Sequence, residues 1–162
     1  MRAVIVDDEN GSIEILQQKI IEFTQGVSIV ATFSDPKEAL PCLERGDFDI
    51  LFLDVDMPAL NGFELISKLK EVKFEIVFTT AYSEFAIEAI RMGAFDYLTK
   101  PILIEDLQKC VTRLKNYILP KTNTESPAFD KINDQHEKIL ISTQEAFEYV
   151  VVEDIILIEA EG

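Results

Sequence analysis

The sequence predicts an α/β fold: a doubly wound, five-stranded parallel sheet with helices on both faces, followed by a short β-rich fragment. Short apolar runs alternate with stretches of helical apolar spacing, and this strand–helix unit occurs five times in about 120 residues. Two of the runs, Ala3–Val6 and Ile50–Leu53, lead directly into acids, as expected for buried strands that end at a ligand-binding edge. Right-handed crossovers leave few topologies for such a sheet, and of these we expect the doubly wound strand order 2-1-3-4-5.

The five predicted strands are short runs that end at polar or turn-forming residues. The first and third are rich in bulky apolar side chains, which favours central strands buried on both faces, whereas the second alternates only loosely. The predicted strands span residues 3–6, 27–33, 49–53, 75–80 and 95–99.

Five helices are predicted, one after each strand. The second has clear boundaries, because Asp35 can cap its start, Pro36 fits the first helical position and Gly46 suits its end. The last is the most regular, with apolar residues spaced 3, 4, 3 and 4 apart between residues 104 and 118. The helices are expected over residues 13–23, 36–45, 63–69, 83–92 and 104–118.

The strand–helix pattern stops after Pro120. We therefore expect a first domain over residues 1–120 and a polar linker over 121–136. Residues 137–162 contain three short strand-like runs with no helix between them, at 138–142, 147–152 and 155–158. So small a piece buries too little surface for independent stability, which predicts the beginning of a second, antiparallel domain that the chain cuts off.

Composition narrows the classes of function. The net charge of −15 and the lack of a basic cluster argue against nucleic acid as a direct partner of this chain. The two cysteines, Cys42 and Cys110, have no metal-binding or redox spacing and are expected to be reduced packing residues. No stretch approaches the ~20 apolar residues that span a membrane, so we expect a cytoplasmic location and no membrane partner.

Polar residues end four of the five predicted strands. The predicted strand order places Asp7, Asp8 and Asp54 beside the point where the order reverses, which is where such sheets bind ligands. Clustered carboxylates suit Mg²⁺ and need a cation between them. Lys100 could supply a second positive charge, Thr80 could donate a hydroxyl to a phosphoryl oxygen, and a carboxylate nucleophile would form an acyl phosphate.

Motifs at these positions identify a family. They occur in order and at the usual spacing over about 120 residues, and they make the chain similar to response-regulator receiver domains, which have a flavodoxin-like fold. The strand order named above is also that of a receiver used as a standard example of this fold, so the fold prediction and the resemblance are not independent. The motifs are Val6-Asp7-Asp8-Glu9, Phe52-Leu53-Asp54-Val55-Asp56-Met57-Pro58, Asn61-Gly62, Thr80-Ala81 and Lys100-Pro101.

The resemblance implies a role for each acid. Asp54 would be the phosphoacceptor, receiving its phosphoryl group from a sensor histidine kinase. Asp8 and Asp54 would bind Mg²⁺ directly, together with the backbone carbonyl of Asp56, and Asp7 would act through water. The protein would not be an enzyme in the usual sense, because it would catalyse only its own phosphoryl transfer and a slow autodephosphorylation.

The resemblance also implies a switch. Thr80 and Tyr97 would form the switch pair, and Lys100 would contact the phosphoryl group, with a cis bond to Pro101. Phosphorylation would bias the face formed by residues 84–119 toward a homodimer. Within the family, the positions two residues after the phosphoacceptor and after the switch threonine tune the phosphate's lifetime. Here they are Asp56 and Tyr82.

The C-terminal segment resembles the start of a LytTR-type DNA-binding domain. The resemblance depends on the runs Ile139–Gln144, Phe147–Val150 and Val152–Ala160, and Phe78–Ala86 also looks typical of receivers joined to that domain. It implies a transcriptional regulator of the LytTR (LytR/AlgR) type that is truncated early in its output domain. DNA would then be bound only through the missing part.

Two other functions are considered. An aspartate-nucleophile phosphatase of the haloacid dehalogenase type also has an Asp-x-Asp motif after an apolar strand, as in Asp54-Val55-Asp56. That motif, however, should lie on the first strand, with the acidic pair downstream, whereas Asp7-Asp8 lies upstream. A degenerate receiver that only binds a partner is the other alternative, and the presence of all five site residues argues against it.

Overall fold

A computed structural model describes residues 1–58, 60–122, 138–142 and 147–151. Its main sheet has five parallel strands in the order β2-β1-β3-β4-β5, so the predicted fold class and topology are confirmed. Each strand lies within one residue of its predicted start and end. The strands are β1 (Arg2–Val6), β2 (Ser28–Phe33), β3 (Ile50–Asp54), β4 (Glu75–Thr80) and β5 (Asp96–Thr99).

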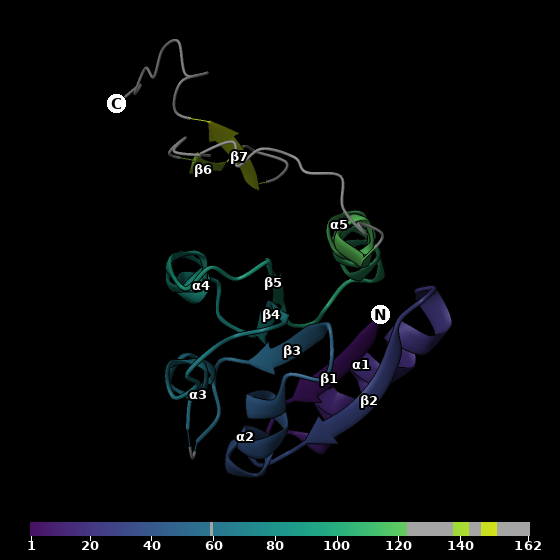
Figure 1. The fold of residues 1–162 in the computed structure, drawn as a ribbon, viewed down its shortest axis with the longest axis vertical. Coiled ribbons are helices and arrows are strands. Elements are labelled where there is room, and N and C mark those ends of the chain that lie inside the picture. The colour runs from purple at the N-terminus through teal and green to yellow at the C-terminus, as the bar shows by residue number, and fades with distance from the viewer. Residues whose placement is uncertain (59, 123–137, 143–146, 152–162) are drawn as a thin grey trace. The chain divides into compact units, whose positions relative to one another are not determined.

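Helices cover both faces of the sheet (Figure 1). Helices α1 and α5 pack on one face, and α2, α3 and α4 pack on the other. The helices are α1 (Asn10–Phe23), α2 (Pro36–Arg45), α3 (Gly62–Ser67), α4 (Ala86–Arg91), preceded by the 3₁₀ turn η1 (Ser83–Phe85), and α5 (Ile104–Thr122).

The central strands β1 and β3 hold the two helical layers together. Their side chains alternate between the layers: Leu51 and Leu53 face the α2–α4 layer, while Ile50 and Phe52 face the α1–α5 layer. All four are fully buried. Burial on both faces explains why these strands are nearly continuous apolar runs, and it holds their carboxyl ends firmly in place.

Helix α2 begins and ends as predicted. The side chain of Asp35 accepts a hydrogen bond from the backbone amide of Lys37 at 2.8 Å, and Pro36 occupies the first helical position. Gly46 follows the last residue with a φ of 64°, a left-handed conformation that glycine adopts without strain.

Several helix boundaries differ from those predicted, including the end of α3, which is Ser67 and not residue 69. The fourth helix does not begin as an α-helix at Ser83, because the first turn is 3₁₀ and α4 starts at Ala86. The first helix begins at Asn10, before the predicted start at residue 13, and Phe23 at its C-terminal end is 41% exposed. The last helix continues past Pro120 to Thr122, two residues into the predicted linker, since proline disfavours the preceding helical residue without forbidding it.

The chain divides into two compact units, Met1–Asn123 and Thr124–Gly162. In the second unit, β6 (Lys138–Ser142) and β7 (Phe147–Val151) form an antiparallel pair, in agreement with two of the three predicted strands. The third predicted strand, at 155–158, lies outside the described residues. Among the residues that the structure describes, no helix has the length and apolar character needed to cross a membrane.

Candidate functional site

The carboxyl ends of four strands meet at one edge of the sheet. Asp7 follows β1, Asp54 ends β3, Thr80 ends β4 and Lys100 follows β5. Pairing of β1 with β3, β3 with β4 and β4 with β5 places these residues in adjacent strands. The structure therefore gathers the strand-end residues that the sequence singled out, and Asp8 lies next to Asp7.

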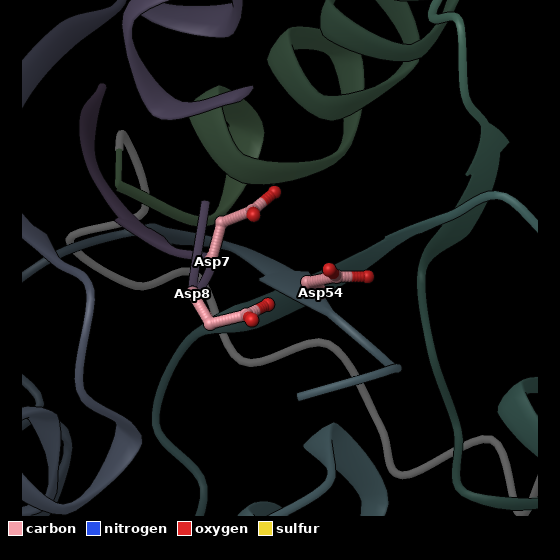
Figure 2. A group of neighbouring side chains, drawn as sticks. All are labelled: Asp7, Asp8 and Asp54. Carbon is pink, nitrogen blue, oxygen red and sulfur yellow. The ribbon is translucent and has the colours of Figure 1, made fainter. Parts of the chain in front are cut away.

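Asp7, Asp8 and Asp54 form a carboxylate cluster (Figure 2). One oxygen of each lies within 4.8 Å of the others. Asp7 and Asp54 are only 3% and 4% exposed, and Asp8 is half-buried. Burial, helped by the charge of Asp7, raises the pKa of both Asp8 and Asp54. The fold thus holds negative charge where it is costly, as functional sites often do.

Lys100 lies between two of these carboxylates. Its Nζ is 2.7 Å from Oδ2 of Asp7 and 2.9 Å from Oδ2 of Asp54. Loss of surrounding water acts to lower the pKa of Lys100, but the hydrogen bonds to Asp7 and Asp54 outweigh that effect and the pKa is raised. Sequence reasoning proposed Lys100 as a phosphoryl contact and did not anticipate that it bridges two acids.

The donor set of the cluster fits a divalent cation. Three carboxylates and one ammonium leave a local charge of −2, which one divalent ion would balance. All the side-chain donors are carboxylate oxygens, the hard ligands that Mg²⁺ prefers. The cluster therefore could bind a metal ion of this kind.

The loop between β3 and α3 folds back onto Asp54. The amide of Gly62 donates to the carbonyl of Val55 at 2.9 Å, and a Cβ added to Gly62 would lie 2.4 Å from the carbonyl oxygen of Asp54. Only glycine permits so close an approach. Asn61 and Glu64 form a capping box at the start of α3, which the pattern Asn-x-x-Glu could have predicted from the sequence alone.

The predicted switch residues form a second group beside the carboxylates. Thr80 is fully buried, and its hydroxyl accepts a hydrogen bond from the amide of Tyr82 at 3.3 Å. The hydroxyl of Tyr97 donates to the carbonyl of Tyr82. Burial, together with the charges of Glu84 and Asp54, raises the pKa of Tyr97 to about 12, so this phenol stays protonated at neutral pH.

The two residues expected to tune the lifetime of the phosphate, Asp56 and Tyr82, have different surroundings. Asp56 is exposed, and its amide donates to Oδ1 of Asp54 at 3.3 Å. Tyr82 is 45% exposed, and its ring meets Phe85 edge-on with the centroids 5.9 Å apart. The bond between Lys100 and Pro101 is cis, as expected from the resemblance.

Known proteins with similar sequences are response regulators. A response regulatory protein of Yersinia pestis is 44% identical over 124 residues, which are 76% of this chain and 52% of that protein. The sensory transduction protein LytT of Bacillus cereus is 32% identical over 165 residues, covering 98% of this chain and 65% of LytT. This chain thus spans between about half and two thirds of these relatives, and its similarity to LytT extends beyond the first compact unit.

Solved structures and a family model agree with these relatives. The response regulatory domain of mrkE from Klebsiella pneumoniae is 33% identical with a TM-score of 0.64, covering 72% of this chain and 97% of that domain. The receiver domain of AraT from Geobacillus stearothermophilus is 32% identical with a TM-score of 0.61, covering 75% and 98%. The model for the response regulator receiver domain matches residues 3–112. The chain therefore belongs to the response regulator receiver family of two-component systems.

Proposed function

We propose that Asp54 accepts a phosphoryl group from a sensor histidine kinase in the cytoplasm and that the chain thereby switches an attached output domain. The observation that carries this proposal is the position of the Asp54 carboxylate. It is almost buried, lies beside Asp7 and Asp8, and is held by the ammonium group of Lys100 at 2.9 Å. A carboxylate held at such cost is typical of a group kept for chemistry rather than for stability.

In the proposed step, a carboxylate oxygen of Asp54 attacks the phosphorus. The bond from phosphorus to the donor's leaving group breaks, and the product is an acyl phosphate. Lys100 and the hydroxyl of Thr80 stand at the adjacent strand ends, where they would contact the phosphoryl oxygens. The chain supplies only position and charge for its own phosphorylation. The phosphoryl group stays on Asp54 and is not released at once as a product.

Mg²⁺ is the proposed cofactor. Asp8 and Asp54 would hold the ion directly with the backbone carbonyl of Asp56, and Asp7 would hold it through water. When bound, the ion supplies positive charge that neutralises the phosphoryl oxygens. The carboxylate cluster supports this assignment, since its donors are oxygens and its local charge is negative.

Treatment with acetyl phosphate tests the proposal most directly. With Mg²⁺ present, intact-mass spectrometry should show one added phosphate that is lost in alkali or hydroxylamine, as an acyl phosphate is. With EDTA in place of Mg²⁺, the addition should fall by at least about 100-fold, because the carboxylate cluster would repel the incoming anion. Absence of any phosphate, together with no binding of Mg²⁺, would instead favour a degenerate receiver that only binds a partner.

Tyr82 should lengthen the life of the acyl phosphate. Its half-exposed ring, supported by Phe85, stands next to Thr80 and can restrict the approach of water. We expect Tyr82→Ala to speed loss of the phosphate by about tenfold, as measured by mass spectrometry after removal of the donor. Asp56, the other lifetime position, would orient or repel the same water. Ile21→Ala, which removes an exposed apolar side chain from α1, outside residues 84–119, should leave the rate unchanged. An unchanged rate in Tyr82→Ala would contradict the shielding role.

The output face is proposed to be residues 84–119. It consists of segment 84–92, which includes α4, segment 95–99, which includes β5, and segment 104–119 of α5. Phosphorylation would draw Thr80 inward and let Tyr97 rotate, which biases this face toward a homodimer as a shift between two states. Ile87 is 65% exposed on this face and offers apolar surface for a partner. Sedimentation should show a larger mass with beryllofluoride than without it, and an unchanged mass at saturating beryllofluoride would argue against dimerisation.

The attached output domain is proposed to be of the LytTR DNA-binding type. Similarity to LytT over 98% of this chain supports this, because the alignment includes the segment after the receiver. In this proposal the receiver is residues 1–120, the linker 121–136, and the start of the output domain 137–162. DNA would be contacted only by residues beyond those of this chain.

A further inference from the structure

Lys19 makes a contact that the proposed mechanism does not use. This half-buried side chain belongs to α1, and its Nζ donates a hydrogen bond of 2.6 Å to the backbone carbonyl of Ile102. The contact joins residues 83 positions apart in the sequence. A hydrogen bond from a charged donor is stronger than one between neutral groups, so it can hold a loop in place.

Ile102 lies two residues after Lys100, in the loop between β5 and α5. The amide of Lys100 donates to the carbonyl of Thr80 at 2.6 Å, which fixes the strand side of this short segment. On the other side, the Ile102 side chain is buried in the core cluster shared by α1 and α5, and the Ile102 carbonyl accepts the hydrogen bond from Lys19. Lys100 therefore projects toward the acids from a segment that is anchored at both ends.

Two of the three acids of the cluster, Asp7 and Asp8, lie in the turn between β1 and α1, whereas Asp54 ends β3. Glu9, the next residue, is the N-cap of α1. Helix α1 thus adjoins two of the acids at its start and, through Lys19, the loop that carries Lys100 farther along. The contact between Lys100 and Asp7 therefore depends on α1 in two ways: α1 follows Asp7 in the chain, and Lys19 of α1 binds the loop that carries Lys100.

We propose that Lys19 is a positioning residue for Lys100: its hydrogen bond to Ile102 holds the loop so that the Lys100 ammonium stays between Asp7 and Asp54. The inference builds on the proposed phosphorylation of Asp54. It predicts two effects of opposite sign when Lys19 is replaced. Phosphoryl transfer slows because Lys100 is misplaced. Cation binding tightens because Lys100 competes less well for Oδ2 of Asp54.

Lys19 could also act only by packing α1 against α5, since side chains of these two helices are in contact. This packing role must be distinguished from the positioning of Lys100. Gln108 provides a matched control. Its Nε2 donates to the carbonyl of Phe23 at 2.9 Å, another side-chain-to-backbone bond made by α1, but to a residue within α5 and not to the loop that carries Lys100. Loss of either bond removes a contact of α1, and only the bond of Lys19 adjoins Lys100.

The test compares Lys19→Met with Lys19→Arg, Gln108→Met and a Lys100→Met background. Phosphorylation by acetyl phosphate is followed by mass spectrometry, and affinity for Mn²⁺, used as the probe for the cation site, is followed by electron paramagnetic resonance. Since a misplacement of about 1 Å can cost about 100-fold in rate, we expect Lys19→Met to slow phosphorylation by about five- to tenfold. It should tighten Mn²⁺ binding by about twofold. Lys19→Arg should keep the phosphorylation rate and the Mn²⁺ affinity close to those of the wild type, and Gln108→Met should change neither.

The decisive arm is the Lys100→Met background. If Lys19 acts through Lys100, then Lys19→Met should have no further effect on Mn²⁺ affinity there, since the two changes are not additive. An equal effect with and without Lys100, or the same changes in Gln108→Met, would overturn the proposal. Failure of the wild-type chain to take up phosphate would count against the proposed function alone, because the Mn²⁺ measurements test Lys19 without any phosphorylation.

Discussion

Replacing Asp54 with asparagine should abolish phosphorylation by acetyl phosphate and, without Mg²⁺, should stabilise the fold at pH 7 by about 1–2 kcal/mol. The amide cannot form an acyl phosphate, so the added mass should disappear completely. The gain in stability follows from burial: Asp54 is 4% exposed and its ionised form is held beside Asp7. An uncharged side chain of the same shape removes that cost.

The pH dependence of stability provides a second test of whether the ionised Asp54 destabilises the fold. Burial raises the pKa of Asp54 in the folded state above the value of 3.8 expected for the unfolded chain. The folded state therefore binds this proton more tightly, and the contribution of Asp54 to stability falls as the pH rises from 3.8 through the raised pKa. In Asp54→Asn this part of the decline should be missing, as measured by urea unfolding between pH 4 and pH 7.

Asp47→Asn is the matched control, because Asp47 is exposed and the change in charge is the same. It should shift the unfolding free energy by less than about 0.5 kcal/mol and leave phosphorylation intact. A phosphate that persists in Asp54→Asn would place the phosphoacceptor elsewhere. A variant that is less stable than wild type would mean that the bond to Lys100 outweighs the cost of burying the carboxylate.

The sequence predicted the sheet and its acidic edge because both depend on local patterns. A strand such as β3 is buried on both faces, so it appears as an apolar run whose end is marked by Asp54. Parallel pairing then brings the ends of β1 and β3 together without any further information. The handedness of crossovers leaves few strand orders, and the one chosen among them is also that of a receiver used as a standard example. The direct metal contact of Asp8 and the switch roles of Thr80 and Tyr97 came only from the family resemblance and remain proposals.

Other features of the site depend on contacts that no local pattern encodes. Lys100 bridges Asp7 and Asp54 because three strands and their helices pack in one particular way, and the sequence shows only a lysine after a strand. The contact of Lys19 with Ile102 has the same origin, since it joins two distant segments. The first turn of the fourth helix was missed for a different reason: α-helical and 3₁₀ turns share the same start signals and differ only in hydrogen bonding.

Replacing Lys100 with methionine should have the opposite effect on stability to that of Asp54→Asn. Methionine keeps much of the packing but leaves Asp7 and Asp54 facing each other with no cation between them. Breaking a fully buried pair costs about 3–5 kcal/mol, and because the Lys100 side chain is 20% exposed we expect about 2 kcal/mol without Mg²⁺. Phosphorylation should slow by about 100-fold, the usual effect of removing one charge from a site of this kind.

Addition of Mg²⁺ should restore more stability to Lys100→Met than to wild type, since the ion then meets no competing ammonium at Asp54. Lys109→Met, whose side chain is 75% exposed, should change neither stability nor response to Mg²⁺. The loss in Lys100→Met should also be smaller when Asp54 is already asparagine, because one of the two opposed carboxylates has gone. An equal loss in both backgrounds would mean that Lys100 stabilises the fold by packing alone. Effects of opposite sign from two side chains only 2.9 Å apart would instead show that Lys100 offsets a charge which the fold holds at a cost.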